Sequence, residues 1–238
     1  MAFLSVNNIS KSFKEEKVLQ NLSFDVKKSE RVAIIGGSGD GKSTLLRLIA
    51  GFDYLDGGQI ELNGQIISSE LSHMAPESRN IGMVFQNYAL FPHLNVMENI
   101  CFGLGVDRNE TDVKKYILML GLEGMEAKYP HELSGGQQQR LAIGRSLILR
   151  PPLMLLDEVM SNVDVLNKNS LIKDISNISR ELDLTLLFVT HDIRDAVALC
   201  DRFLFIEDGK LVQDGTLNEI RANPASDFIM AHLNLIFR

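Results

Sequence analysis

Residues 31–44 read RVAIIGGSGDGKST, and this stretch decides the fold. An apolar run, typical of a buried strand, enters a loop with four glycines and then a helix that carries Leu45, Leu48 and Ile49 at helical spacing. The loop fits the pattern G-x-x-x-x-G-K-[ST]. Its glycines let backbone N–H groups curl around phosphate oxygens at a helix start, where the helix dipole favours anions. The stretch therefore predicts an α/β protein that binds a nucleoside triphosphate.

The side chains of the loop have separate predicted tasks. Lys42 is expected to reach the β and γ phosphates, and Ser43 to ligate Mg²⁺. A glycine-rich turn with an ordinary helix-capping lysine is the alternative, and the strand–loop–helix context argues against it. The predicted nucleotide-binding residues of the loop are Gly36, Gly37, Ser38, Gly39, Asp40, Gly41, Lys42, Ser43 and Thr44.

Buried-strand patterns recur along the chain, separated by helical patterns. IGMVF is followed by Gln86, LMLLD ends at Asp157, and LTLLFVT is followed by His191. Strands separated by helices indicate a parallel sheet, whose ligands bind at the carboxyl ends of the strands. We therefore expect these three side chains to form one site with the phosphate loop.

Other parts of the chain depart from this alternation. QIELNGQII and RFLFIEDGKLVQDG are hairpin patterns, with Asn63-Gly64 and Asp208-Gly209 at their turns. Residues 88 to about 150 lack a strong strand run and are expected to be mainly helical. The predicted architecture is a single domain of residues 1–238, with an N-terminal antiparallel β subdomain, a mostly parallel core and an inserted helical subdomain at about 88–150.

Two acids end one of the buried strands and suggest catalysis. Asp157 is expected to hold Mg²⁺ through water, and Glu158 to orient or deprotonate an attacking water as a general base. Alternatively, the pair begins a helix, whose dipole favours acidic side chains there. His191, Gln86 and Phe13 are weak signals in isolation, since each also fits a structural role.

Residues 133–140, LSGGQQQR, form a second glycine-rich helix start. Ser134 and Gln137 fit a capping box, in which each side chain satisfies a backbone N–H of the other. Thr216 and Glu219 predict a second capping box before a C-terminal helix. The capping box does not explain the adjacent Gly135 and Gly136, which cost backbone entropy unless another group approaches the backbone closely.

The motifs together resemble those of the ATP-binding-cassette ATPase family over essentially the whole chain. In order, they are an aromatic in SKSF, GGSGDGKS, a strand-end glutamine, LSGGQ, LMLLDE, SNVD and a strand-end histidine. LSGGQ is the signature of that family. The resemblance implies a P-loop NTPase core of RecA-like type, ATP and Mg²⁺ as cofactors, and Mg-dependent ATP hydrolysis.

The resemblance also implies roles for individual residues. Phe13 stacks on adenine, Gln86 contacts the metal or water, and His191 contacts the γ-phosphate. Two cassettes pack head to tail, so that the signature of each closes over ATP on the loop of its partner, with Asp164 near the interface. The implied catalytic residues are Lys42, Glu158 and His191, the metal ligands are Ser43, Gln86 and Asp157, and the signature contacts are Ser134, Gly135, Gly136 and Gln137.

Three positions depart from the family pattern. Asp40 stands where a small residue is usual, and a carboxylate about 8 Å from a phosphate, at a dielectric of roughly 20, costs on the order of 2 kcal/mol per charge pair. We therefore expect Asp40 to weaken ATP binding, although solvent, Mg²⁺ and Lys42 offset part of this cost. Val159 replaces a proline and is expected to loosen the turn at Glu158, and SNVD replaces SALD.

Composition limits the function classes. The formal charge is 24 minus 31, or −7, without a block of like charge, so nucleic acid is not an expected partner. Cys101 and Cys200 lack metal-ligand spacing and are expected to be buried thiols in a reducing cytosol. No apolar run has the length of a signal peptide core or a membrane span. A cytoplasmic protein, peripheral on the inner face of the cell membrane, is expected.

The resemblance therefore predicts the ATPase subunit of a transporter, with separate permease subunits and a solute-binding protein. The segment NYALFPHLNVMENI resembles the permease-docking surface of importers of small polar solutes such as polyamines, oxyanions, metal ions or osmoprotectants. Its Tyr88 and Phe91 equally fit packing inside the helical subdomain. Because the chain ends at Arg238, no C-terminal regulatory β-domain is expected. The alternatives are a non-transport cassette ATPase, an export ATPase and a nucleotide-gated binding module.

Overall fold

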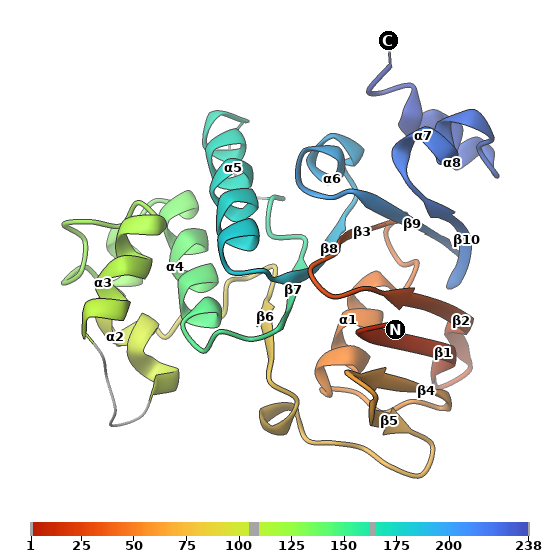
Figure 1. The fold of residues 1–238 in the computed structure, drawn as a ribbon, viewed down its shortest axis with the longest axis horizontal. Helices are drawn as coiled ribbons and strands as arrows, with labels where there is room; N and C mark the ends of the chain where they lie inside the picture. Colours follow the sequence, from red (N-terminus) through yellow and green to blue (C-terminus); the bar gives the residue numbers. More distant parts are fainter. Residues whose placement is uncertain (1, 105–109, 162–164, 238) are drawn as a thin grey trace.

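The computed structural model of the chain describes residues 2–104, 110–161 and 165–237. Within these residues the strands form two sheets, and most helices lie around the larger one (Figure 1). The strands are β1 Leu4–Phe13, β2 Glu16–Val26, β3 Arg31–Ile35, β4 Gly57–Leu62, β5 Gln65–Ser69, β6 Ile81–Val84, β7 Leu153–Asp157, β8 Thr185–Thr190, β9 Arg202–Glu207 and β10 Lys210–Gly215. The α-helices are α1 Lys42–Ala50, α2 Val96–Cys101, α3 Glu110–Met119, α4 Gly135–Leu147, α5 Val165–Glu181, α6 Ile193–Leu199, α7 Leu217–Ala222 and α8 Asp227–Leu233. Short 3₁₀ helices are η1 Pro76–Ser78, η2 Phe102–Leu104 and η3 Pro130–Glu132.

The smaller sheet has the order β2-β1-β4-β5, and its neighbouring strands are antiparallel. β4 and β5 are joined at Asn63-Gly64, where both residues have positive φ, 52° and 77°. Asn and Gly tolerate this conformation, which matches the twist of a two-residue hairpin. The predicted antiparallel sheet and its hairpin are confirmed.

The larger sheet has the order β10-β9-β3-β8-β7-β6. β3, β6, β7, β8 and β9 are parallel to their neighbours, and only β10 is antiparallel, joined to β9 at Asp208-Gly209. Every residue of β7 and β8 is buried. This agrees with the near-continuous apolar runs of their sequences, because a parallel sheet is covered on both faces. The predicted mostly parallel core and second hairpin are confirmed.

Side chains alternate between two apolar cores along the parallel strands. In β7, Met154 and Leu156 belong to the core shared with α4, α5 and α6. Leu153 and Leu155 belong to the core shared with α1 and the smaller sheet. Because successive strand residues point to opposite faces, Asp157 follows Leu153 and Leu155 onto the face covered by α1. The period of the strand thereby directs this carboxylate toward the phosphate loop.

The register of the sheet brings the strand ends to one edge. Ile35 of β3 lies opposite Thr190 of β8, and Val189 lies opposite Asp157 of β7. Val84 of β6 lies opposite Leu156. The segments that follow these strands therefore begin side by side, as the chain pattern predicted.

Helices α2, α3 and α4 lie within residues 88 to about 150, the stretch expected to be mainly helical (Figure 1). Both predicted capping boxes are present, at Ser134 before α4 and at Thr216 before α7.

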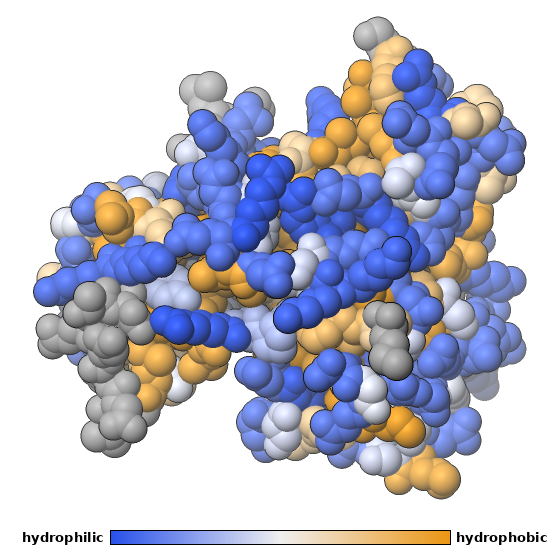
Figure 2. Space-filling model, in the orientation of Figure 1, coloured by the Kyte–Doolittle hydropathy of each residue, from blue (hydrophilic) through white to orange (hydrophobic). Residues whose placement is uncertain are grey.

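Cys101 and Cys200 are buried and neither is in a disulfide bond, as predicted. No helix within the described residues is long and apolar enough to span a membrane. Figure 2 shows apolar side chains gathered over α2 and the C-terminal helices, on a face that is otherwise mostly polar.

Candidate functional site

The phosphate loop, Gly36–Gly41, runs from the end of β3 to the first residue of α1. Gly39 and Gly41 have φ of 94° and 85°, in the left-handed region that favours glycine. A Cβ at Gly41 would lie 2.7 Å from the carbonyl oxygen of Val18, and one at Gly36 would lie 2.5 Å from that of Ile206. Glycine at these positions lets the loop pack directly on the neighbouring strands.

A cavity of about 320 Å³ opens at the loop and the start of α1. Its lining comes from the loop and from the ends of β6 and β7, which brings together residues far apart in sequence. The lining residues are Val18, Ser38, Gly39, Gly41, Lys42, Ser43, Thr44, Gln86 and Glu158. Val18 was not predicted as a site residue, because a valine in a strand pattern carries no signal of a ligand.

Lys42 is the first residue of α1 and is only 5% exposed. Its ammonium donates a hydrogen bond of 2.5 Å to the carbonyl oxygen of Gly37. The lysine is thus folded over its own loop, at a helix N-terminus whose free N–H groups attract anions. This arrangement places the charge where a bound phosphate chain would meet it.

Ser43, which lines the cavity, forms a hydrogen bond with Asp157 at the end of β7. The hydroxyl of Ser43 donates to Oδ1 of Asp157 at 2.8 Å. Burial raises the pKa of the Asp157 carboxyl above its ordinary value; the hydrogen bond from Ser43 and the charges of Lys42 and Arg47 oppose the rise, while the charge of Glu158 adds to it. A cation next to this carboxylate would favour its ionised form.

These oxygens fit a magnesium ion. Mg²⁺ binds proteins through one or two carboxylates and hydroxyls and completes its shell with phosphate and water oxygens. The hydroxyl of Ser43 and the carboxylate of Asp157 are already neighbours. Gln86 lines the same cavity and carries an amide oxygen. The three predicted ligands are therefore of the right chemistry, although their coordination remains a prediction.

Glu158 sits in a strained turn directly after β7. Its φ is 46°, a left-handed conformation that is uncommon for a residue with a side chain. The N–H of Glu158 donates to the carbonyl oxygen of Val189 at 3.0 Å. The carbonyl oxygen of Glu158 accepts a hydrogen bond from the hydroxyl of Ser161 at 2.9 Å. These bonds from β8 and from the following turn hold the carboxylate at the cavity mouth.

His191 meets Glu158 from the end of β8. Its Nδ1 lies 3.6 Å from Oε2 of Glu158, and its ring is largely exposed, at 61%.

Val159, the replacement for proline, is 1% exposed and packs in the core of α4–α6. Whether the turn at Glu158 is looser than with proline stays a prediction.

Phe13 and Asp40, two further predicted site residues, do not line this cavity. Phe13 ends β1 and is 46% exposed, with the ammonium of Lys11 5.2 Å from its ring centroid. The carboxylate of Asp40 is bonded to backbone N–H groups of Gly37 and Asp208. Asp164 lies outside the described residues. Roles of Phe13 and Asp164 toward a nucleotide remain predictions.

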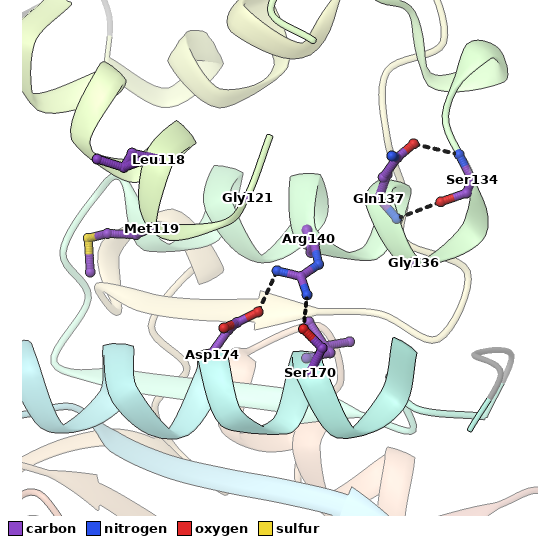
Figure 3. A pocket seen from close by; sticks show the side chains of 10 residues that line it. Leu118, Met119, Gly121, Ser134, Gly136, Gln137, Arg140, Ser170 and Asp174 are labelled. Atoms are coloured by element: carbon purple, nitrogen blue, oxygen red, sulfur yellow. Dashed lines mark hydrogen bonds and ion pairs between the residues drawn. The ribbon is translucent and has the colours of Figure 1, made fainter. Parts of the chain in front are cut away.

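Part of the LSGGQ stretch lines a second cavity, of about 410 Å³, between α3, α4 and α5 (Figure 3). Ser134, Gly136 and Gln137 form one side of it. Ser134 and Gln137 bond to each other's N–H groups, so the two glycines are left to present the backbone at the helix start. The two cavities share no lining residue among the described parts of the chain.

Arg140 organises the floor of this second cavity. Its guanidinium pairs with Asp174 of α5 and donates to the hydroxyl of Ser170 at 2.9 Å (Figure 3). It also donates to the carbonyl oxygen of Leu120 at 3.0 Å. Arg140 ends the QQQR run, but its partners on α5 and on the turn after α3 cannot be found in the sequence pattern.

Tyr88 and Phe91 take part in packing. Tyr88 is partly buried against the core of the helical region, and Phe91 contacts the ring of Phe102 at 4.2 Å between centroids. The guanidinium of Arg145 lies 4.9 Å from the Phe91 ring centroid. The packing alternative is thus present, and Phe102 remains 57% exposed beside it.

Comparisons with known proteins agree with these motifs. A sequence model of the ABC transporter family matches residues 19–161. The chain is 40% identical over 230 residues to the spermidine/putrescine import ATP-binding protein PotA of Marinobacter nauticus, covering 94% of this chain and 61% of that protein. It is 42% identical over 230 residues to the sulfate/thiosulfate import ATP-binding protein CysA 2 of Chromobacterium violaceum, covering 95% and 62%.

The fold comparison gives the same result. The solved structure of cbiO1 from Clostridium perfringens, described as part of the ABC transporter complex cbiONQ, matches with a TM-score of 0.83 and 26% identity. The match covers 99% of this chain and 96% of that one. The chain spans about 60% of the length of the two import proteins. By its sequence match and its fold, this chain belongs to the ABC transporter family.

Proposed function

We propose that this chain is the ATP-binding and ATP-hydrolysing subunit of a membrane transporter. The observation that carries the proposal is the hydrogen bond to Asp157 from Ser43, which lines one cavity together with Lys42, Gln86 and Glu158. A phosphate-binding lysine, a metal-binding pair and a candidate base at one cavity are the components that phosphoryl transfer to water requires.

The residues divide the chemistry between them. Lys42 and the loop N–H groups bind the phosphates and neutralise charge that develops as the terminal phosphoryl group leaves. Glu158 orients a water and accepts its proton, and His191, beside that carboxylate, contacts the γ-phosphate. Ser43, Asp157 and Gln86 would hold Mg²⁺, which would supply positive charge that stabilises the phosphate oxygens.

Two copies of the chain are needed for a complete site in this proposal. The signature cavity is separate from the phosphate loop of the same chain, and Figure 1 shows α4 well apart from α1. Free N–H groups at the start of α4 can close on a γ-phosphate only if another chain supplies it. A two-fold dimer would bring each signature onto the partner's loop and form two sites.

Permease subunits are the proposed second partner. An exposed aromatic side chain lies beside Gln86: Phe52 is 44% exposed and contacts Phe85 at 5.6 Å between ring centroids. Phe102 and Phe91 form a second aromatic pair. Aromatic residues on a polar surface are typical of protein interfaces. We infer that membrane subunits dock here, at the cytoplasmic face of the membrane.

The transported substrate is proposed only as a class. The two similar proteins are named as import subunits for spermidine/putrescine and for sulfate/thiosulfate. Both substrates are small and polar, so we propose an importer of a small polar solute, working with a solute-binding protein. Both the direction and the class would be tested by solute uptake in cells that lack this chain.

A mixing experiment tests the composite site. Lys42→Ala removes the phosphate contact, and Ser134→Arg blocks the signature cavity. Each variant alone should hydrolyse ATP at least tenfold more slowly than the parent. If the sites form between chains, a mixed dimer retains one intact site, so an equimolar mixture should recover part of the rate. No recovery in a mixture shown by light scattering to form dimers would overturn the composite site.

Glu158→Gln tests hydrolysis itself. The substitution removes the base without changing the size of the side chain. We expect ATP turnover to fall by about 100-fold or more, with Mg-ATP still bound and an ATP-held dimer visible by light scattering. Turnover equal to that of the parent would show that Glu158 is not the base.

A further inference from the structure

We propose that Asp40 is a positioning residue: its carboxylate holds Gly37, and through Gly37 the ammonium of Lys42, in the geometry that receives phosphates. This inference rests on the proposed ATP-binding function. It differs from the electrostatic expectation, in which Asp40 acts only by repelling the phosphates.

Gly37 is the centre of a short chain of contacts. Its N–H donates to Oδ2 of Asp40 at 2.5 Å, and the N–H of Asp40 donates back to the carbonyl oxygen of Gly37 at 3.4 Å. The same carbonyl oxygen accepts the ammonium of Lys42 at 2.5 Å. Because Gly37 has no side chain to restrict its backbone, these bonds decide which way its peptide groups face. Asp40 thus influences the position of the Lys42 ammonium through Gly37, without contacting Lys42.

The second oxygen of Asp40 ties the loop to a distant turn. The N–H of Asp208 donates to Oδ1 of Asp40 at 3.2 Å. This turn joins β9 to β10 and is itself fixed to β2, since Gln20 donates to Gly209 through its N–H and to Asp208 through its side chain, at 2.9 Å and 3.0 Å. β2 also carries Val18, which lines the nucleotide cavity. One carboxylate therefore links the loop, the turn and a wall of the cavity.

The placement of the carboxylate favours anchoring over repulsion. The nucleotide cavity is lined by Ser38, Gly39 and Gly41 of the loop, whereas both Asp40 oxygens accept backbone N–H groups. A Cβ built on Gly36 would lie 3.0 Å from Oδ2 of Asp40 and 2.5 Å from the carbonyl oxygen of Ile206. The carboxylate thus lies close to the loop backbone on the side of β9. Two N–H donors compensate the negative charge where it stands.

Three variants separate the two explanations. Asp40→Ala removes the charge and both acceptors, and Asp40→Asn removes the charge but keeps one acceptor oxygen. Asp208→Asn is the matched control: it removes a charge from an exposed side chain beside the loop and leaves the Asp208 N–H in place. Asparagine also tolerates the left-handed φ of 49° at that position.

Binding of Mg-ATP and Mg-ADP is then measured by calorimetry for the parent and each variant. Anchoring predicts that Asp40→Ala weakens Mg-ATP binding about tenfold and Asp40→Asn about threefold, with Asp208→Asn unchanged. The loss should be larger for Mg-ATP than for Mg-ADP, because Lys42 acts at the β and γ phosphates. Repulsion predicts tighter binding in both Asp40 variants. Tighter or unchanged binding in Asp40→Ala would overturn the proposal.

Amide hydrogen exchange without nucleotide tests the anchor independently of ATP. The N–H groups of Gly37 and Asp208 should exchange faster in Asp40→Ala than in the parent and in Asp208→Asn. Unchanged exchange at both amides would overturn the anchor, whatever the binding data show. If the parent itself binds no Mg-ATP, the proposed function is wrong. The hydrogen-exchange data alone then test whether Asp40 anchors Gly37 and Asp208. If Asp40→Ala does not fold, the near-isosteric Asp40→Asn is compared in its place.

Discussion

Replacing Arg145 with lysine tests how helix α4 controls the segment that follows Gln86. Arg145 donates to the carbonyl oxygens of Ala89 and Tyr88 at 2.6 Å and 3.4 Å, and its guanidinium lies 4.9 Å from the ring centroid of Phe91. Tyr88 and Ala89 have φ of 61° and 47°. Such left-handed residues cost about 1–3 kcal/mol each and persist only where neighbouring groups enforce them. Arg145 is one of the groups that hold them, since it donates to both of their carbonyl oxygens.

The magnitude follows from these contacts. A hydrogen bond from a charged donor contributes about 1.5–3 kcal/mol, and a cation over a ring about 0.5–1 kcal/mol. Burial of the guanidinium, which lowers the pKa of Arg145, offsets part of this. Lysine can replace one bond but lacks the planar fork. We therefore expect Arg145→Lys to lose about 2 kcal/mol of the interactions that hold the segment.

The effect should appear in turnover. Tyr88 closes the turn that carries Gln86 through a 2.9 Å hydrogen bond to Phe85, so a relaxed segment displaces Gln86. If the full 2 kcal/mol is lost from stabilisation of the transition state, kcat drops about 30-fold. If only part of it is lost there, kcat drops a few-fold. KM for ATP should change little, because the phosphate loop is untouched.

Steady-state ATP hydrolysis and amide exchange over residues 85–91 are the two measurements. The matched control is Arg180→Lys, an exposed arginine on α5. Faster exchange and a lower kcat in Arg145→Lys, with neither in the control, would support the reasoning. A parental kcat together with parental exchange would refute it, since the segment would then hold its shape without the arginine.

Two other residues give further predictions. The pKa of Asp157 is raised by burial, so Mg²⁺ affinity should fall as the pH is lowered through a range above 3.8, the ordinary value, as binding titrations can show. Because the pKa of Asp157 is raised, its buried charge lowers the stability of the fold at neutral pH, and this loss disappears as the carboxyl becomes protonated. Asp157→Asn should therefore raise Tm by a few degrees without Mg²⁺. The same substitution should abolish the increase in Tm that Mg-ATP gives the parent. Arg79 is 2% exposed and donates to the carbonyl oxygens of Leu48 and Ile49, both at 2.9 Å, so Arg79→Met should lower stability by about 3 kcal/mol, measurable by urea unfolding. An Arg79→Met variant with parental stability would contradict this account.

Local features of the fold were predictable from the sequence because consecutive residues determine them. The buried runs of β3, β7 and β8, the Asn63-Gly64 turn and the capping box at Ser134 each depend on residues a few positions apart. Periodicity, turn chemistry and helix capping act at that range. The phosphate loop belongs to the same class, since its glycines are required by its own backbone.

The tertiary structure decided the contacts that make the loop a site. Ser43 meets Asp157 across 114 residues, and Asp40 meets Asp208 across 168. Strand order and register determine such pairs, and a local sequence pattern does not predict which strands become neighbours. The position of Asp40 in the motif therefore predicted only a charge effect. Its partner Asp208, on the turn after β9, could be identified only once the sheet placed β9 beside β3, because hydrogen bonds depend on distance in space and not on separation along the chain.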